Sequence, residues 1–92
     1  VRWARSATKH RISRQRSGYV VEHCGLQFVE LDWRQNRTRA DVRVVFLGDD
    51  LEAVPLEVIA VETEEDDFLV IHAMKMRNRF ATLYEEARRW RS

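Results

Sequence analysis

The sequence predicts an α+β domain with two short N-terminal helices, a four-stranded and mainly antiparallel sheet, and a C-terminal helix packed on that sheet. Three observations predict it. The first 23 residues carry helix signals, apolar and polar residues alternate from Leu26 onward, and apolar residues recur at spacings of three and four after residue 79. The 92 residues have room for one modest core, so residues 1–92 form a single predicted domain.

Two helices are expected before the first strand. Residues 4–11 can form the first, and the following Ile-Ser pair interrupts it. Ser13 is a favourable N-cap for the second helix, which runs over residues 14–23. Gly25 then supplies the left-handed residue that commonly ends a helix.

Four strands follow, each recognised by a period of two or by an apolar run between turn residues. The polar run 34–39 separates the first two strands, and Pro55 suits the entry to the third because a missing N–H costs least there. The acidic turn 63–67 makes the last two strands an antiparallel hairpin. The expected strands are residues 26–33, 42–47, 56–62 and 68–74.

The final helix follows the last strand and ends near residue 90. Its apolar residues form one stripe, which packs on the sheet. The stripe consists of Phe80, Leu83, Tyr84, Ala87 and Trp90.

Charge is segregated along the chain, although the formal net charge is only +1. Residues 1–21 contain no acid, whereas residues 49–67 contain nine acids and no Lys or Arg. This asymmetry suggests a cationic face for nucleic acid and an acidic region that points toward a basic partner. The alternative is that both are solvated polar faces.

Several classes of protein are not supported by the sequence. The single cysteine, Cys24, excludes an intrachain disulfide and a thiolate metal cluster, and a reducing cytoplasm fits best. No apolar run is long enough to span a bilayer, and no secretory signal is visible, so no membrane role is expected. The three histidines lack the short spacing of metal ligands, and nucleotide-binding motifs are missing. We therefore expect neither metal nor cofactor.

Cationic side chains gather at two places that could meet in the fold. The corner between the last strand and the last helix carries His72, Lys75, Arg77 and Arg79, and helix starts bind anions. Alternation places His72 on one strand face with Phe68, Val70 and Met74, where a hydrogen-bonded core histidine is the alternative to a catalyst.

The second group lies near the N-terminal end and contains Lys9, His10 and Arg11, which could also serve only to stabilise a helix C-terminus. Arg14 and Arg16 occupy the first turn of a helix, where positive charge is unfavourable, so they hint at an anionic ligand.

This inventory suits metal-independent RNA cleavage, which needs a base, an acid and cations around the phosphate. His72 or His10 would transfer the proton, and Lys9, Lys75 and Arg77 would stabilise the phosphate. The RNA backbone would be held by Arg11, Arg14, Arg16 and Arg79. Tyr84 is a weaker candidate, because its place on the apolar stripe favours a core role. The hypothesis requires the two ends of the chain to surround a single pocket.

Two segments resemble BrnT-like toxins of the RelE/ParE superfamily. Residues 70–86, VIHAMKMRNRFATLYEE, are similar to the closing strand and helix of these toxins, and residues 7–13, ATKHRIS, are similar to an element near their start. Met74 stands where such toxins have arginine, Arg11 where they have glycine, and Phe80 where they have an acid. The resemblance implies a RelE/ParE-like fold, RNA cleavage that arrests translation on free RNA or at the ribosome, and a cognate antitoxin that represses its operon, for example through a ribbon-helix-helix domain.

Two other classes of function remain open from the sequence. One is a non-catalytic module of the same fold that binds nucleic acid or blocks a protein target. The other is a small interaction domain whose acidic segment 49–67 docks a basic partner.

Overall fold

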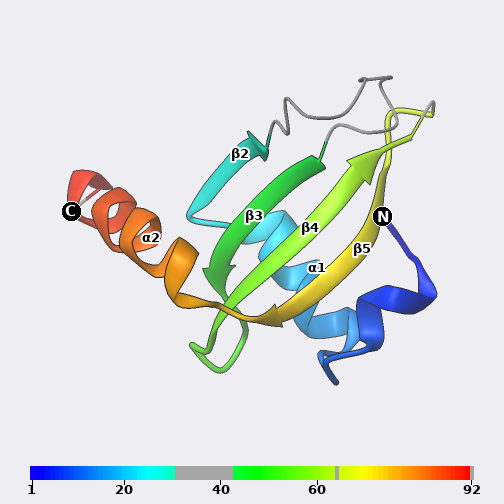
Figure 1. Cartoon of the computed structure of the whole chain (residues 1–92), viewed down its shortest axis with the longest axis horizontal. Coiled ribbons are helices and arrows are strands. Elements are labelled where there is room, and N and C mark those ends of the chain that lie inside the picture. Colours follow the sequence, from blue (N-terminus) through cyan, green and yellow to red (C-terminus); the bar gives the residue numbers. More distant parts are fainter. Residues whose placement is uncertain (31–42, 64, 92) are drawn as a thin grey trace.

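The computed structural model describes residues 1–30, 43–63 and 65–91, which form a five-stranded mixed sheet flanked by two α-helices (Figure 1). The strand order is β1-β5-β4-β3-β2, with β1 parallel to β5 and every other neighbouring pair antiparallel. In chain order the elements are β1 (Arg2–Trp3), the 3₁₀ helix η1 (Arg5–Thr8), α1 (Arg14–His23), β2 (Leu26–Glu30), β3 (Arg43–Asp49), β4 (Pro55–Glu62), β5 (Phe68–Lys75) and α2 (Asn78–Arg91).

The predicted architecture, with two N-terminal helices and a four-stranded RelE/ParE-like sheet, is wrong. The chain opens with a strand, because Arg2 and Trp3 pair in parallel with β5 and the Ala4 N–H donates to Val70 O at 2.8 Å. The first expected helix is reduced to the 3₁₀ turn η1. A two-residue strand has too few residues to show a period of two, so its pairing with a distant edge left no pattern in the sequence.

The second expected helix, α1, begins as predicted, because Ser13 Oγ accepts a hydrogen bond from the Arg16 N–H at 3.2 Å. It also ends at His23 as predicted, but the predicted left-handed conformation of Gly25 is wrong. No described glycine has a positive φ, and Cys24 ends the helix in an extended conformation. Gly25 is instead a residue of close approach, since a Cβ there would lie 3.1 Å from Cε1 of Tyr84.

The hairpin β4–β5 matches the predicted antiparallel pairing of the last two strands, and Pro55 is the first residue of β4. Strands β3 and β4 also pair in antiparallel fashion. The predicted stretch 31–33 and the predicted loop 34–39 lie outside the described residues.

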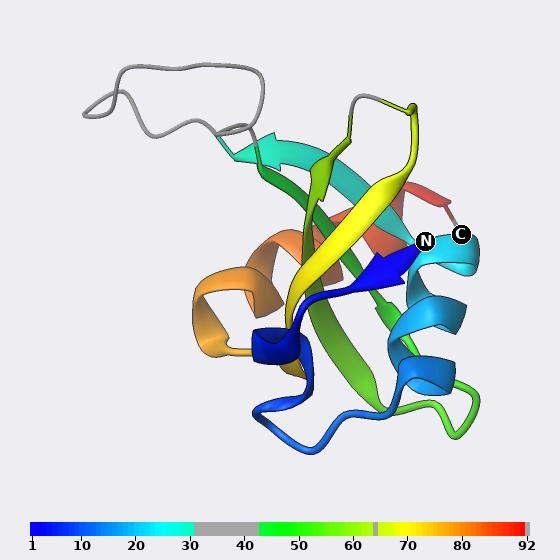
Figure 2. The ribbon, with the colours of Figure 1, turned by 90° about the vertical axis from the view of Figure 1, so that its right-hand side faces the viewer.

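The two helices cover opposite faces of the sheet (Figure 2). On one face, Val20 of α1 packs in a buried cluster with Phe46, Leu56 and Val58 of the central strands. On the other face, Phe80 and Tyr84 of α2 pack on Val45, Leu47 and Ile59. The predicted stripe of α2 is only partly buried, because Phe80 and Tyr84 enter the core whereas Leu83 is 44% exposed.

A bulge in β5 changes the faces of its side chains. Ile59 pairs with His72 and Ala60 pairs with Val70, which leaves Ile71 without a partner across the ladder. Val70 accordingly packs in the cluster under α1, whereas Ile71 packs in the cluster under α2. The predicted face shared by His72 with Phe68 and Val70 is therefore wrong, because the bulge turns His72 toward the α2 side.

Candidate functional site

The two cationic ends of the sequence meet at the exposed edge of β5. The rings of His10 and His72 lie 5.4 Å apart between centroids in an edge-to-face arrangement. The segment before His10 is fastened to this edge, because Ser6 Oγ donates to Ile71 O at 2.8 Å. The two histidines therefore lie together as expected, but Lys9 and His72 are not among the residues that line the neighbouring pocket.

An open pocket of about 460 Å³ lies beside this histidine pair. Its walls come from the turn after η1, the first turn of α1 and the end of β5. Lys9, Arg11 and Lys75 have no ion-pair partner among the described residues, so their charges are available to an anionic ligand. The residues lining the pocket are His10, Arg11, Ile12, Arg16, Met74 and Lys75.

Arg11 is held in a strained backbone conformation at the pocket wall. Its φ is 63°, in the left-handed region that glycine adopts freely and other residues adopt at a cost of about 1–2 kcal/mol. The backbone N–H of Arg11 donates to Thr8 O at 3.1 Å, which closes the turn after η1. A large cationic side chain therefore occupies a position where glycine would be the more stable residue.

Glu57 on β4 forms a buried polar network behind His72. Its side chain has no exposed surface, yet it accepts the Arg77 N–H at 2.8 Å and Arg77 Nη2 at 2.7 Å. Arg77 Nε adds bonds of 3.0 and 3.1 Å to the two carboxylate oxygens. His72 Nε2 lies 3.1 Å from Glu57 Oε2. One carboxylate thus joins β4, β5 and the start of α2.

The ionisation of this network follows from burial and from its charges. Burial alone would raise the pKa of Glu57, but the hydrogen bonds and charge of Arg77, helped by His72, outweigh it and hold that pKa below its ordinary value. Burial lowers the pKa of His72, Glu57 opposes this, and the charges of Arg77 and His10 lower it further. The result is an ionised Glu57 beside a His72 that favours its neutral form.

The anion site predicted at the start of α2 is filled from inside the protein. Glu57 takes the backbone N–H of Arg77 and its guanidinium group, so Arg77 serves the carboxylate and its side chain is not free for phosphate as the sequence suggested. The side chain of Arg77 remains 43% exposed.

Three further predicted RNA-binding arginines also have partners within the protein. The guanidinium group of Arg14 lies 5.7 Å from the ring centroid of Trp3. Arg16 Nε donates to Asp50 Oδ2 at 2.6 Å, and Arg79 Nη2 lies 3.2 Å from Glu30 Oε1. The unfavourable charges in the first turn of α1 are therefore explained without an external anion.

Sequence reasoning missed Glu57 and Asp50, both of which lie within the acidic segment 49–67. Asp50 is buried and accepts two backbone N–H groups in the β3–β4 turn as well as Arg16. Glu57 could have been noticed as a single acid inside the apolar run 54–61. Asp50 gives no such signal, because acids are common in turns.

Tyr84 has the core role that the sequence favoured. Its hydroxyl donates to Asp49 Oδ1 at 2.9 Å, and burial together with this bond raises the pKa of Tyr84 to about 12.

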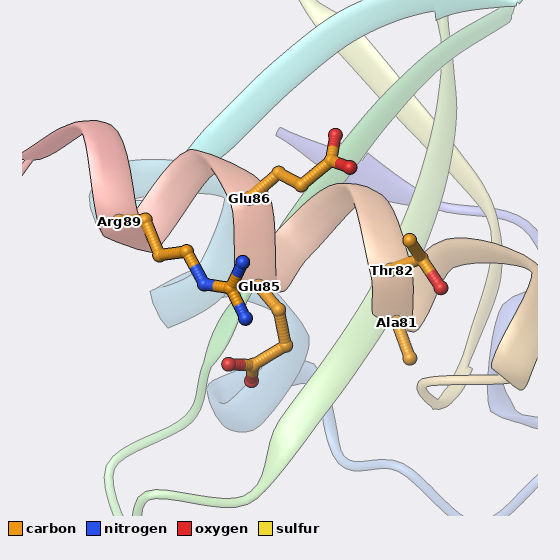
Figure 3. A pocket seen from close by; sticks show the side chains of 5 residues that line it. All are labelled: Ala81, Thr82, Glu85, Glu86 and Arg89. Carbon is orange, nitrogen blue, oxygen red and sulfur yellow. The ribbon is translucent and has the colours of Figure 1, made fainter.

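A second hollow, of about 310 Å³, is lined by α2 alone (Figure 3). Its residues are Ala81, Thr82, Glu85, Glu86 and Arg89. Because one helix supplies every side chain, this hollow brings no distant groups together.

Within the described ranges, no three His, Cys, Asp or Glu side chains are placed to hold a metal ion. No helix of these ranges has the length and apolar character to cross a bilayer.

Comparisons with protein families, curated proteins and solved structures give no match for this chain.

Proposed function

We propose that this protein is a metal-independent endoribonuclease whose catalytic groups are His10 and His72. The observation that carries the proposal is the pair of imidazoles, 5.4 Å apart, beside an open pocket lined by Arg11 and Lys75. Two imidazoles can act as base and acid near neutral pH.

The reaction would be an intramolecular transesterification of the RNA strand. One imidazole removes the proton of a ribose 2′-hydroxyl, and the oxygen attacks the adjacent phosphorus. The other imidazole gives a proton to the 5′-oxygen as its bond to phosphorus breaks. The products are a 2′,3′-cyclic phosphate and a 5′-hydroxyl, and the unpaired charges of Lys9, Arg11 and Lys75 stabilise the charge on the transition state.

The resemblance to BrnT-like toxins supports a biological setting for this activity. In that setting the protein is the toxin of a bacterial type II toxin–antitoxin system, acts in the cytoplasm on free or ribosome-bound RNA, and arrests translation. A cognate DNA-binding antitoxin would neutralise it. Coexpression with the neighbouring gene and mass measurement of the copurified complex test this assignment.

Cleavage of a labelled RNA in excess EDTA tests the activity, with the 3′ ends of the products identified by mass spectrometry. We expect cyclic phosphate ends for the native protein and a rate loss of about 10²- to 10⁴-fold for His10→Ala and His72→Ala. His23→Ala is the matched control, because this ring stacks on Tyr19 at the end of α1 and should be dispensable. A native protein that binds RNA with steep salt dependence but never cuts it would instead be the non-catalytic module.

A further inference from the structure

We propose that Glu57 is a positioning residue that holds His72 with its proton on Nε2, so that Nδ1 is the atom that accepts the proton of the ribose hydroxyl. The catalytic part of this inference rests on the proposed ribonuclease function. It assigns His72 as the base and His10 as the acid, which the pair alone does not decide.

Glu57 is buried at a place in the sheet where a charge is costly. A carboxylate with no exposed surface lies on β4 between the buried apolar residues Leu56 and Val58. Burial of a charge is costly unless the charge is fully paired. Such a group needs a specific reason to occupy a central strand.

The pairing of Glu57 determines which ring nitrogen of His72 carries a hydrogen. The guanidinium group of Arg77 supplies charged donors to both oxygens of Glu57, from Nε at 3.0 Å to Oε1 and from Nη2 at 2.7 Å to Oε2. A carboxylate in this setting is ionised and can only accept hydrogen bonds. The His72 nitrogen that faces it at 3.1 Å, Nε2, must therefore carry a hydrogen. In the neutral ring the lone pair then resides on Nδ1.

Arg77 alone donates to both oxygens of Glu57. The additional bond to His72 is therefore not needed to satisfy the buried carboxylate. The bulge at Ile71 places His72 on the same side of the sheet as Glu57. The charged or titratable groups that face His72 are Glu57 from β4, Arg77 before α2 and His10 after η1. Burial, Arg77 and His10 lower the pKa of His72 and outweigh the opposing effect of Glu57, which favours the neutral ring that a base requires.

Glu57→Gln tests the assignment, because glutamine has a single acceptor oxygen. The Arg77 N–H and Nε would hold that oxygen at the Oε1 position, so the amide NH₂ would take the Oε2 position that faces His72. Nε2 of His72 must then accept a hydrogen bond from this NH₂, so the ring proton moves to Nδ1. We expect nitrogen NMR of the histidine rings to show the Nε2–H form in the native protein and the Nδ1–H form in the variant, with His72 signals assigned by their loss in His72→Ala.

Kinetics supply the second readout. A wrong tautomer removes the base without removing substrate contacts, so we expect kcat for RNA to fall at least 100-fold with KM changed less than about threefold. An Nδ1–H form in the native protein overturns the proposal, and so does a variant that changes tautomer but keeps its kcat. If Glu57→Gln does not fold, the tautomer of His72 in the native protein still decides whether Glu57 holds the proton on Nε2. If no version cuts RNA, the ribonuclease proposal fails while the NMR result still tests the positioning of His72.

Discussion

Replacement of Arg11 by glycine should make the protein more stable and a weaker RNA binder. Arg11 has a φ of 63°, so glycine relieves about 1–2 kcal/mol of backbone strain. Glycine also gives the unfolded chain more freedom, which returns about 0.5–1 kcal/mol. The net gain is about 0.5–1 kcal/mol, or a rise of about 2–8 °C in Tm for a domain of this size.

The matched control is Arg11→Ala, which removes the same charge but keeps a Cβ in the left-handed region. Both variants should lose one phosphate contact, and the slope of log affinity against log salt for single-stranded RNA should fall by about 0.7 in each. Only the glycine variant should melt at a higher temperature. Calorimetry and RNA titrations at several salt concentrations measure the two effects separately.

Two results would refute this reasoning. A lower Tm for Arg11→Gly than for Arg11→Ala would mean that the turn after η1 carries no strain, because only the greater freedom of the unfolded glycine chain would then separate the two variants. An unchanged salt slope in both variants would mean that Arg11 does not contact the RNA backbone, and Lys75 would be left as the one lining cation without an ion-pair partner in the described part of the pocket.

Two further predictions concern stability. Asp50→Asn removes the charge paired with Arg16 at 2.6 Å and should cost about 1.5–3 kcal/mol. Burial would raise the pKa of Asp50, but hydrogen bonds from the turn backbone and Arg16 lower it below 3.8. The stabilisation by Asp50 is therefore complete above pH 3.8 and declines as the pH falls further. Urea unfolding at several pH values should show this loss of stability at low pH in the native protein and less of it in the variant. Gly25→Ala should cost about 1 kcal/mol because its Cβ would meet Tyr84 Cε1 at 3.1 Å, and a higher Tm in thermal unfolding would contradict this crowding.

Local patterns were enough to predict most individual elements of this fold. Ser13 marks the start of α1, and alternation along residues 56–62 and 68–74 predicts the β4–β5 hairpin that forms. These features depend on interactions between residues close together in the sequence, so the sequence pattern predicts them. The arrangement of the N-terminal segment depends on pairing between Trp3 and Val70, which no local pattern records.

The charges of the candidate site could be predicted from the sequence, but its hydrogen bonds and ion pairs could not. His10 and Lys75 line one pocket, as charge clustering suggested. The side of the sheet reached by His72 could not be predicted, because one unpaired residue at Ile71 reverses the alternation without changing the composition. Likewise, the partners of Arg16 and Arg77 come from distant strands, so their apparent freedom in the sequence was misleading.

The pairing of β1 with β5 determines when the two imidazoles first meet during synthesis. His10 leaves the ribosome long before His72, and the parallel strand pair that brings them together joins segments distant in sequence, a contact that forms late in folding. A nascent chain therefore carries no assembled pair of imidazoles until β5 has emerged. Any chemistry that needs both rings, including the proposed RNA cleavage, would have to wait until the last strand has left the ribosome.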